Sequence, residues 1–122
     1  MPLLFLLHAC ASDNPEQSAG GTDEAGKTTA VVFDTDFGPD YDDVGALAVL
    51  HALADRGEAE ILATIASNGH PLVAPSLDVV NTWFGRPDLP IGAPDSSVVS
   101  EGARQGWADS LVAEYPHDLR ST

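Results

Sequence analysis

Short apolar runs alternate with segments of helical spacing from about residue 30 to the end of the chain. The runs are rich in β-branched residues and have the length of buried strands. Between them, apolar side chains recur three or four positions apart, as on one face of a helix, and Gly57 and Gly85 are natural helix ends. His51 stands in the apolar stripe of the first helix, where we expect it to be half-buried. The predicted strands cover residues 30–33, 61–66 and 89–92, and the predicted helices cover 44–57, 73–84 and 107–115.

This order of strands and helices predicts an α/β fold. We expect an open, mainly parallel sheet with helices on its faces, in a Rossmann-like topology. One domain is the natural expectation for 122 residues, and the hydrophobic share of 43% is ordinary for a globular chain. We place that domain at residues 30–122.

The first ten residues differ from the rest of the chain. An apolar run from Leu3 to Leu7 leads to Cys10, and residues 7–10 resemble the lipobox of bacterial lipoproteins, in which the cysteine is acylated. Residues 11–29 are small and polar, as in a solvated tether. We therefore expect residues 1–10 to be an export signal and Cys10 to carry a lipid that anchors the protein to the bacterial cell envelope, on its periplasmic or extracellular face. The alternative is a frayed apolar N-terminus with an incidental cysteine.

Charge and cysteine content exclude several kinds of partner and site. The chain has 19 acidic and 5 basic side chains, and its net charge of −14 argues against nucleic acid, because phosphate contacts need clustered basic residues. The single cysteine excludes an internal disulfide and a cysteine-rich zinc site. No apolar run approaches the ~18–20 residues of a membrane span, so we expect contact with a membrane only through the lipid anchor.

Acidic side chains gather directly after the first predicted strand. In open α/β sheets, ligands bind beyond the carboxyl ends of strands. Close carboxylates repel one another unless solvent or a cation neutralises them, and oxygen ligands favour Ca²⁺ or Mg²⁺, although the spacing does not fit an EF-hand. The alternative is that some of these side chains cap the following helix, which would occupy one or two of them. The five aspartates are Asp34, Asp36, Asp40, Asp42 and Asp43.

Two stretches of the sequence match known patterns in order. Residues 34–47 read DTDFGPDYDDVGAL, and residues 81–92 read NTWFGRPDLPIG. The first is similar to the DTDPG and DD signature of the inosine/uridine-preferring nucleoside hydrolase family, and closer to a branch that reads DTDxGNDxDDALAL. The second resembles that family's NTYYGRPDxPIG segment. Phe37 and Pro39 depart from these patterns, and the resemblance covers roughly residues 29–122.

The resemblance implies roles for three of the aspartates. Asp36 matches the residue that binds Ca²⁺ and acts as general base toward the attacking water. Asp43 matches the second Ca²⁺ ligand, and Asp42 matches the neighbouring residue that helps to hold the ribose hydroxyls. The implied cofactor is therefore Ca²⁺.

Other positions receive less specific roles. Asp34 matches a supporting residue close to the strand, and the role of Asp40, in the extension of this branch, is open. Asn68 lies near a family asparagine that contacts the sugar. A comparison without gaps places His70 there instead.

The resemblance also implies an activity. Members of the family hydrolyse the N-glycosidic bond of ribonucleosides to ribose and a base, so a ribonucleoside is the expected small-molecule substrate. Self-association into a homo-oligomer stays open. Family members are longer than this chain, and we expect it to represent the N-terminal part of such a domain, an incomplete member of the family. Whether this short chain is active by itself stays open.

Two other functions remain as alternatives. The strand followed by Asp34-Thr35-Asp36 also resembles the start of a haloacid dehalogenase-type phosphatase, in which Asp34 would be the nucleophile. Gly38 and the further aspartates do not fit that pattern. The second alternative is a non-catalytic, truncated calcium-binding lipoprotein.

Overall fold

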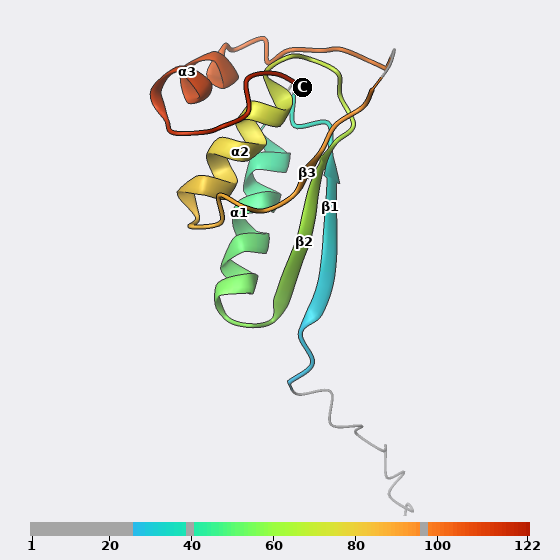
Figure 1. Ribbon diagram of the computed structural model, residues 1–122, viewed down its shortest axis with the longest axis vertical. Coiled ribbons are helices and arrows are strands. Elements are labelled where there is room, and N and C mark those ends of the chain that lie inside the picture. The colour runs from blue at the N-terminus through green and yellow to red at the C-terminus, as the bar shows by residue number, and fades with distance from the viewer. Residues whose placement is uncertain (1–25, 39–40, 96–97) are drawn as a thin grey trace, which may run out of the picture.

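A computed structural model of the protein describes residues 26–38, 41–95 and 98–122. The described residues form an α/β fold with a three-stranded parallel sheet in the order β1-β2-β3 (Figure 1). The predicted α/β class, with an open parallel sheet and flanking helices, is confirmed. The elements are β1 (Thr29–Thr35), α1 (Asp42–Asp55), β2 (Ala59–Ala66), α2 (Val73–Trp83), β3 (Ile91–Gly92) and α3 (Trp107–Glu114).

The helices α1 and α2 lie on one face of the sheet (Figure 1). Crossovers between parallel strands are right-handed, and the strand order runs in a single direction, so both crossover helices are carried to the same side. Side chains on the opposite face remain accessible, and Val32 and Leu62 are 55% and 47% exposed. The expectation of helices on both faces is therefore not met within the described residues.

Both ends of the acidic segment differ from the prediction. β1 continues to Thr35, so Asp34 belongs to the strand rather than to the loop after it. The residues of β1 alternate between accessible and partly buried positions, which shows that only one face of this strand is covered. The helix α1 begins at Asp42, two residues before Val44, so Asp42 and Asp43 form its first turn.

The hydrophobic core lies between the sheet and the two crossover helices. Phe37, Leu47 and Leu77 are its largest buried apolar side chains, each at most 1% exposed. Their removal from water is the main favourable contribution to folding. No helix among the described residues is long and apolar enough to cross a membrane.

The C-terminal segment packs back onto α2. A carboxylate oxygen of Asp78 accepts hydrogen bonds from the backbone N–H groups of Asp118 and Leu119, at 2.7 and 2.8 Å. The hydroxyl of Thr122 accepts a hydrogen bond from the backbone N–H of Ala74 at 2.9 Å. These contacts hold the C-terminal segment against α2, which is buried along most of its length.

Candidate functional site

The chemically interesting side chains lie at the carboxyl end of the sheet. β1 ends at Thr35 and β2 ends at Ala66. The two strands stay paired just beyond these ends, because the N–H of Ser67 donates to the Thr35 carbonyl at 2.9 Å. The loop with Asp36 follows β1, and the loop with Asn68 follows β2. The two loops therefore lie side by side at the carboxyl end of the sheet, which is the usual position of ligand sites in such folds.

The loop after β1 is fixed by the burial of Phe37. This side chain is 1% exposed, and its ring meets the ring of Trp107 edge to face at a centroid distance of 5.7 Å. Its backbone has φ +36°, a strained conformation for a residue other than glycine, and its N–H donates to the Thr35 hydroxyl at 3.0 Å. Because Phe37 points inward, the preceding residue, Asp36, is exposed to solvent.

Asp42 and Asp43 stand in the first turn of α1. The positive end of the helix dipole favours carboxylates at this position. The position of these two aspartates in the first turn agrees with the capping alternative. The N-cap residue itself, Tyr41, makes no side-chain capping hydrogen bond within the described residues. Asp42 is exposed and Asp43 is half-buried.

Asn68 is the most constrained of the predicted site residues. It is 2% exposed, and its amide oxygen accepts hydrogen bonds from the backbone N–H groups of His70 and Glu101, at 3.0 and 3.1 Å. Its amide nitrogen donates to the Glu101 carbonyl at 2.7 Å. Asn68 thus ties the loop after β2 to a segment 33 residues later in the chain.

Gly38 brings the two loops together. A Cβ atom at this position would lie 2.6 Å from the amide nitrogen of Asn68 and 3.0 Å from the carbonyl oxygen of Glu101. Only a residue without a side chain allows this approach of the backbone. Residues 36–38, Asn68 and Glu101 therefore meet at one point. The roles of Gly38 and Glu101 were not predicted, although Gly38 matches the glycine of the DTDxG pattern.

His70 and Asp34 take part in different local structure. The ring Nδ1 of His70 accepts a hydrogen bond from the backbone N–H of Leu72 at 3.3 Å, and the ring packs against Gly102. Asp34 is exposed within β1 and pairs in register with Ile65. Two other predicted positions, Asp40 and Cys10, lie outside the described residues.

The fit of a calcium ion can be judged from the donor atoms. The exposed Asp36, together with Asp42 and Asp43 on the first turn of α1, offers carboxylate oxygens, which are the ligands that a hard cation prefers. Within the described residues, no three His, Cys, Asp or Glu side chains converge in a way that could hold a metal ion. The chemistry of the donors therefore fits calcium, while a complete ligand set is not assembled in this part of the chain.

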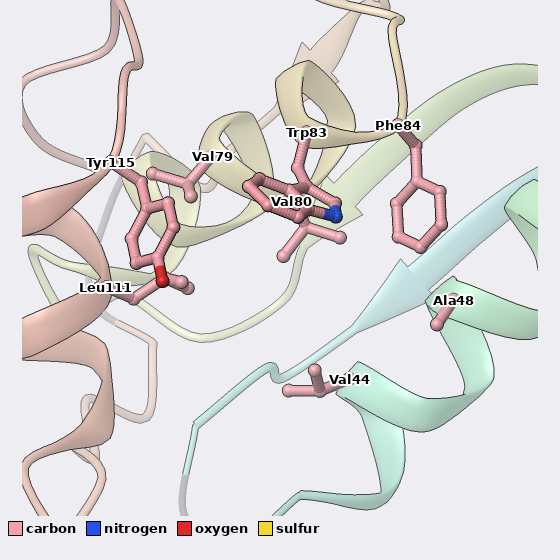
Figure 2. A pocket seen from close by; sticks show the side chains of 8 residues that line it. All are labelled: Val44, Ala48, Val79, Val80, Trp83, Phe84, Leu111 and Tyr115. Carbon is pink, nitrogen blue, oxygen red and sulfur yellow. The ribbon is translucent and has the colours of Figure 1, made fainter.

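A second feature, an apolar cavity, lies among the helices. Its volume is about 260 Å³, and Figure 2 shows Val44 and Ala48 of α1 facing side chains of α2 and of the segment that carries α3. The aromatic rings of Trp83 and Tyr115 meet edge to face there, and Trp83 is 71% exposed. Among the described residues its lining contains no carboxylate, unlike the loops at the carboxyl end of the sheet. It is lined by Val44, Ala48, Val79, Val80, Trp83, Phe84, Leu111 and Tyr115.

Comparison with known proteins adds no identification. No family model, no curated protein and no solved structure matches the chain. The geometry at the carboxyl end of the sheet and the sequence motifs are therefore the basis for a functional proposal.

Proposed function

We propose that this protein belongs among the nucleoside hydrolases and hydrolyses the N-glycosidic bond of ribonucleosides with the help of calcium. The observation that carries the proposal is the placement of Asp36, Asp43 and Asn68. Asp36 follows β1, Asp43 lies in the first turn of α1, and Asn68 follows β2, so all three lie at one end of a parallel sheet. This is the end at which open α/β folds bind small ligands, and the residues are those implied by the motif in residues 34–47.

Each side chain has a chemical task in this proposal. Asp36 is exposed, so it can approach a water molecule and take its proton as that water attacks the anomeric carbon. Asp42 accepts a hydrogen bond from a ribose hydroxyl. Asn68 is held rigidly by Glu101 and His70, so it can fix the loop after β2 beside the sugar and reduce the conformational entropy that binding would cost.

Asp36 and Asp43 would hold the calcium ion. A bound calcium ion supplies positive charge that orients the sugar hydroxyls and the attacking water. The carboxylates around the sugar also favour the positive charge that develops on the ring as the bond to the base breaks. Asp34 supports the site from the end of β1.

The activity is tested by release of reducing sugar from inosine and uridine by the full chain, with calcium and with a chelator. We expect calcium-dependent release, and a loss of about 10²–10⁴-fold in Asp36→Asn, because the general base is removed. Asp88→Asn is the matched control, since it makes the same charge change in the turn before β3. The proposal is contradicted if wild type and Asp36→Asn release sugar equally, or if neither releases any.

The two alternatives give different results in the same experiments. A phosphatase would release phosphate from an aryl phosphate, be trapped by aluminium fluoride, and lose this activity in Asp34→Asn, because Asp34 would be the nucleophile. A non-catalytic calcium-binding lipoprotein would bind calcium and release no sugar from either nucleoside. No observation in the structure favours either over the hydrolase.

We also propose that the protein is exported and anchored to the bacterial cell envelope through a lipid on Cys10. Support comes from the apolar run before Cys10 and the polar residues after it. Mass spectrometry of the mature N-terminus tests this proposal. An acylated Cys10 is expected, and an intact Met1 with a free Cys10 thiol would contradict it.

A further inference from the structure

A buried histidine connects three elements of the core. His51 of α1 is completely buried, and its ring Nε2 lies 3.0 Å from the amide oxygen of Asn81 on α2. The amide nitrogen of Asn81 in turn donates to the hydroxyl of Thr64 on β2 at 3.1 Å. All three side chains are buried and cannot reach water, so these hydrogen bonds satisfy polar groups that would otherwise have no partner.

The other ring nitrogen of His51 faces an arginine. Nη1 of Arg86 lies 3.2 Å from Nδ1 of His51 and 3.2 Å from the carbonyl oxygen of Phe84. Nη2 of Arg86 donates to a carboxylate oxygen of Asp55 at 2.6 Å. The imidazole also stacks on the Phe84 ring, with centroids 4.6 Å apart and planes 8° from parallel. Arg86 thereby links the turn after α2 to the end of α1.

This arrangement accepts only one protonation state of His51. A guanidinium group can only donate hydrogen bonds, so Nδ1 of His51 must be unprotonated to accept one from Arg86. Nε2 then carries the proton and donates it to the amide oxygen of Asn81. The amide orientation agrees, because the nitrogen of Asn81 is directed to Thr64.

Protonation of Nδ1 would place an N–H group against the N–H of Arg86, and two positive charges side by side. Burial is the largest influence and lowers the pKa of His51, while the hydrogen bond to Asn81 raises it. The charge of Arg86 also lowers this pKa, and the charge of Asp55 raises it. Arg86 and Asp55 are the charged groups that face the ring, while α2 and β2 contribute the uncharged Asn81 and Thr64.

We propose that His51 and Arg86 form an acid-sensitive latch that holds the turn after α2 against α1. Protonation of Nδ1 ends the hydrogen bond from Arg86 and repels the guanidinium group. The turn at residues 84–86 then detaches from α1, while the sheet remains folded. This latch is independent of the proposed hydrolase activity, because none of its residues lies at the carboxyl end of the sheet.

The direction of the pH effect follows from the lowered pKa. Well above its ordinary pKa of about 6.5, the histidine is neutral in both the closed and the open turn, so pH has little effect on the latch. Below that value the open turn binds a proton that the closed turn rejects, so the open population grows by up to about tenfold per pH unit. The gain ends when the pH falls below the pKa of His51 in the closed state.

The latch is tested by nuclear magnetic resonance on the full chain between pH 7.5 and 5.0. The ring nitrogen shifts of His51 should show the Nε2–H form at pH 7.5 and a titration midpoint below 6.5. As the pH is lowered, hydrogen-exchange protection should decrease for the backbone N–H groups of Phe84, Gly85 and Arg86. It should stay constant for the backbone N–H groups of β2. A midpoint at or above 6.5, unchanged protection, or an equal loss in β2 would each overturn the proposal.

Two arginine variants isolate the role of Arg86. In Arg86→Met we expect the midpoint of His51 to rise and the pH dependence of protection at residues 84 and 85 to become weaker, because the repulsion from Arg86 is removed while burial still lowers the pKa. Arg56→Met is the matched control, because Arg56 also forms an ion pair, with Glu58 at 2.6 Å, but does not approach His51. Equal behaviour of the two variants would contradict the latch. If Arg86→Met does not fold, the wild-type titration alone still decides, since the ring nitrogen shifts report the state of His51 directly.

Discussion

At the scale of single residues, the candidate site depends on opposite environments for two neighbours. Phe37 is buried in the core, and Asp36, one position earlier, is exposed at the end of the sheet. The strained backbone at Phe37 persists because burial of its ring against Trp107 compensates for it. A side chain that is chemically inert thus determines where the proposed general base lies.

The first prediction concerns Phe37. Replacing it by alanine should lower the free energy of unfolding by about 3–5 kcal/mol, because a large buried side chain is removed and a cavity remains. Urea unfolding of wild type and Phe37→Ala measures the difference. Tyr41→Ala is the control, since Tyr41 is 54% exposed and also contacts Trp107. Equal losses in the two variants would show that Phe37 does not anchor the loop.

The second prediction concerns the proposed calcium ligands. Asp36→Asn and Asp43→Asn should each weaken calcium binding at least about tenfold, because each substitution removes a charged oxygen ligand. Isothermal titration calorimetry of the full chain measures the affinities. Asp109→Asn, in the first turn of α3, is the matched control and should bind as wild type does. Unchanged binding in both site variants would exclude calcium from this position.

At the scale of elements, α1 combines good and poor positions for a helix. Gly45 lies inside the helix with open space around it, while Gly57 follows the helix with φ +74°. Glycine is unfavourable in a helix interior but well suited to a left-handed position. The same residue type therefore has opposite effects at the two ends of one element.

The third prediction uses these two glycines. Gly45→Ala should raise the free energy of unfolding by about 0.5–1 kcal/mol, because alanine loses less backbone entropy on folding. Gly57→Ala should lower it by about 1 kcal/mol, because an L side chain is strained at this φ. Thermal unfolding of both variants gives the signs. Two changes of the same sign would mean that α1 does not span Asp42–Asp55 in solution.

At the scale of the whole molecule, the sheet is covered by helices on one face and exposes apolar side chains on the other. Ile61 faces the helices and is 9% exposed, whereas its neighbour Leu62 is 47% exposed. Parallel sheets usually have both faces covered. The exposed face is therefore the part of this molecule where the fold departs most from the usual architecture.

The fourth prediction compares these two neighbours. Ile61→Thr should lower the free energy of unfolding by about 2 kcal/mol, because it places a hydroxyl in the core. Leu62→Thr should change it by less than about 0.5 kcal/mol, because threonine suits an exposed strand position. Urea unfolding at several protein concentrations measures both. An equally large loss in Leu62→Thr would show that another surface covers this face in solution.

The order of strands and helices could be predicted from the sequence because apolar periodicity is a local property of the chain. The position of Asp36 just beyond a strand follows from the same pattern. The predicted boundaries were less accurate at Asp34 and Asp42, because an aspartate at a strand end or in a first helical turn resembles a loop residue in the sequence. Likewise, the stripe that contains His51 predicted partial burial, whereas the residue is completely buried.

The tertiary structure alone decided which distant residues meet. Asn68 binds Glu101, 33 positions later, and His51 contacts Arg86, 35 positions later. No periodicity relates residues at such separations, because the strand order and the path of the connecting segments determine these contacts. The sequence by itself determined the elements and placed the acidic residues next to a strand. The fold decided that both crossover helices lie on one face of the sheet and that Phe37 is buried while Asp36 is exposed. It also decided that only one protonation state of His51 fits the hydrogen bonds with Asn81 and Arg86.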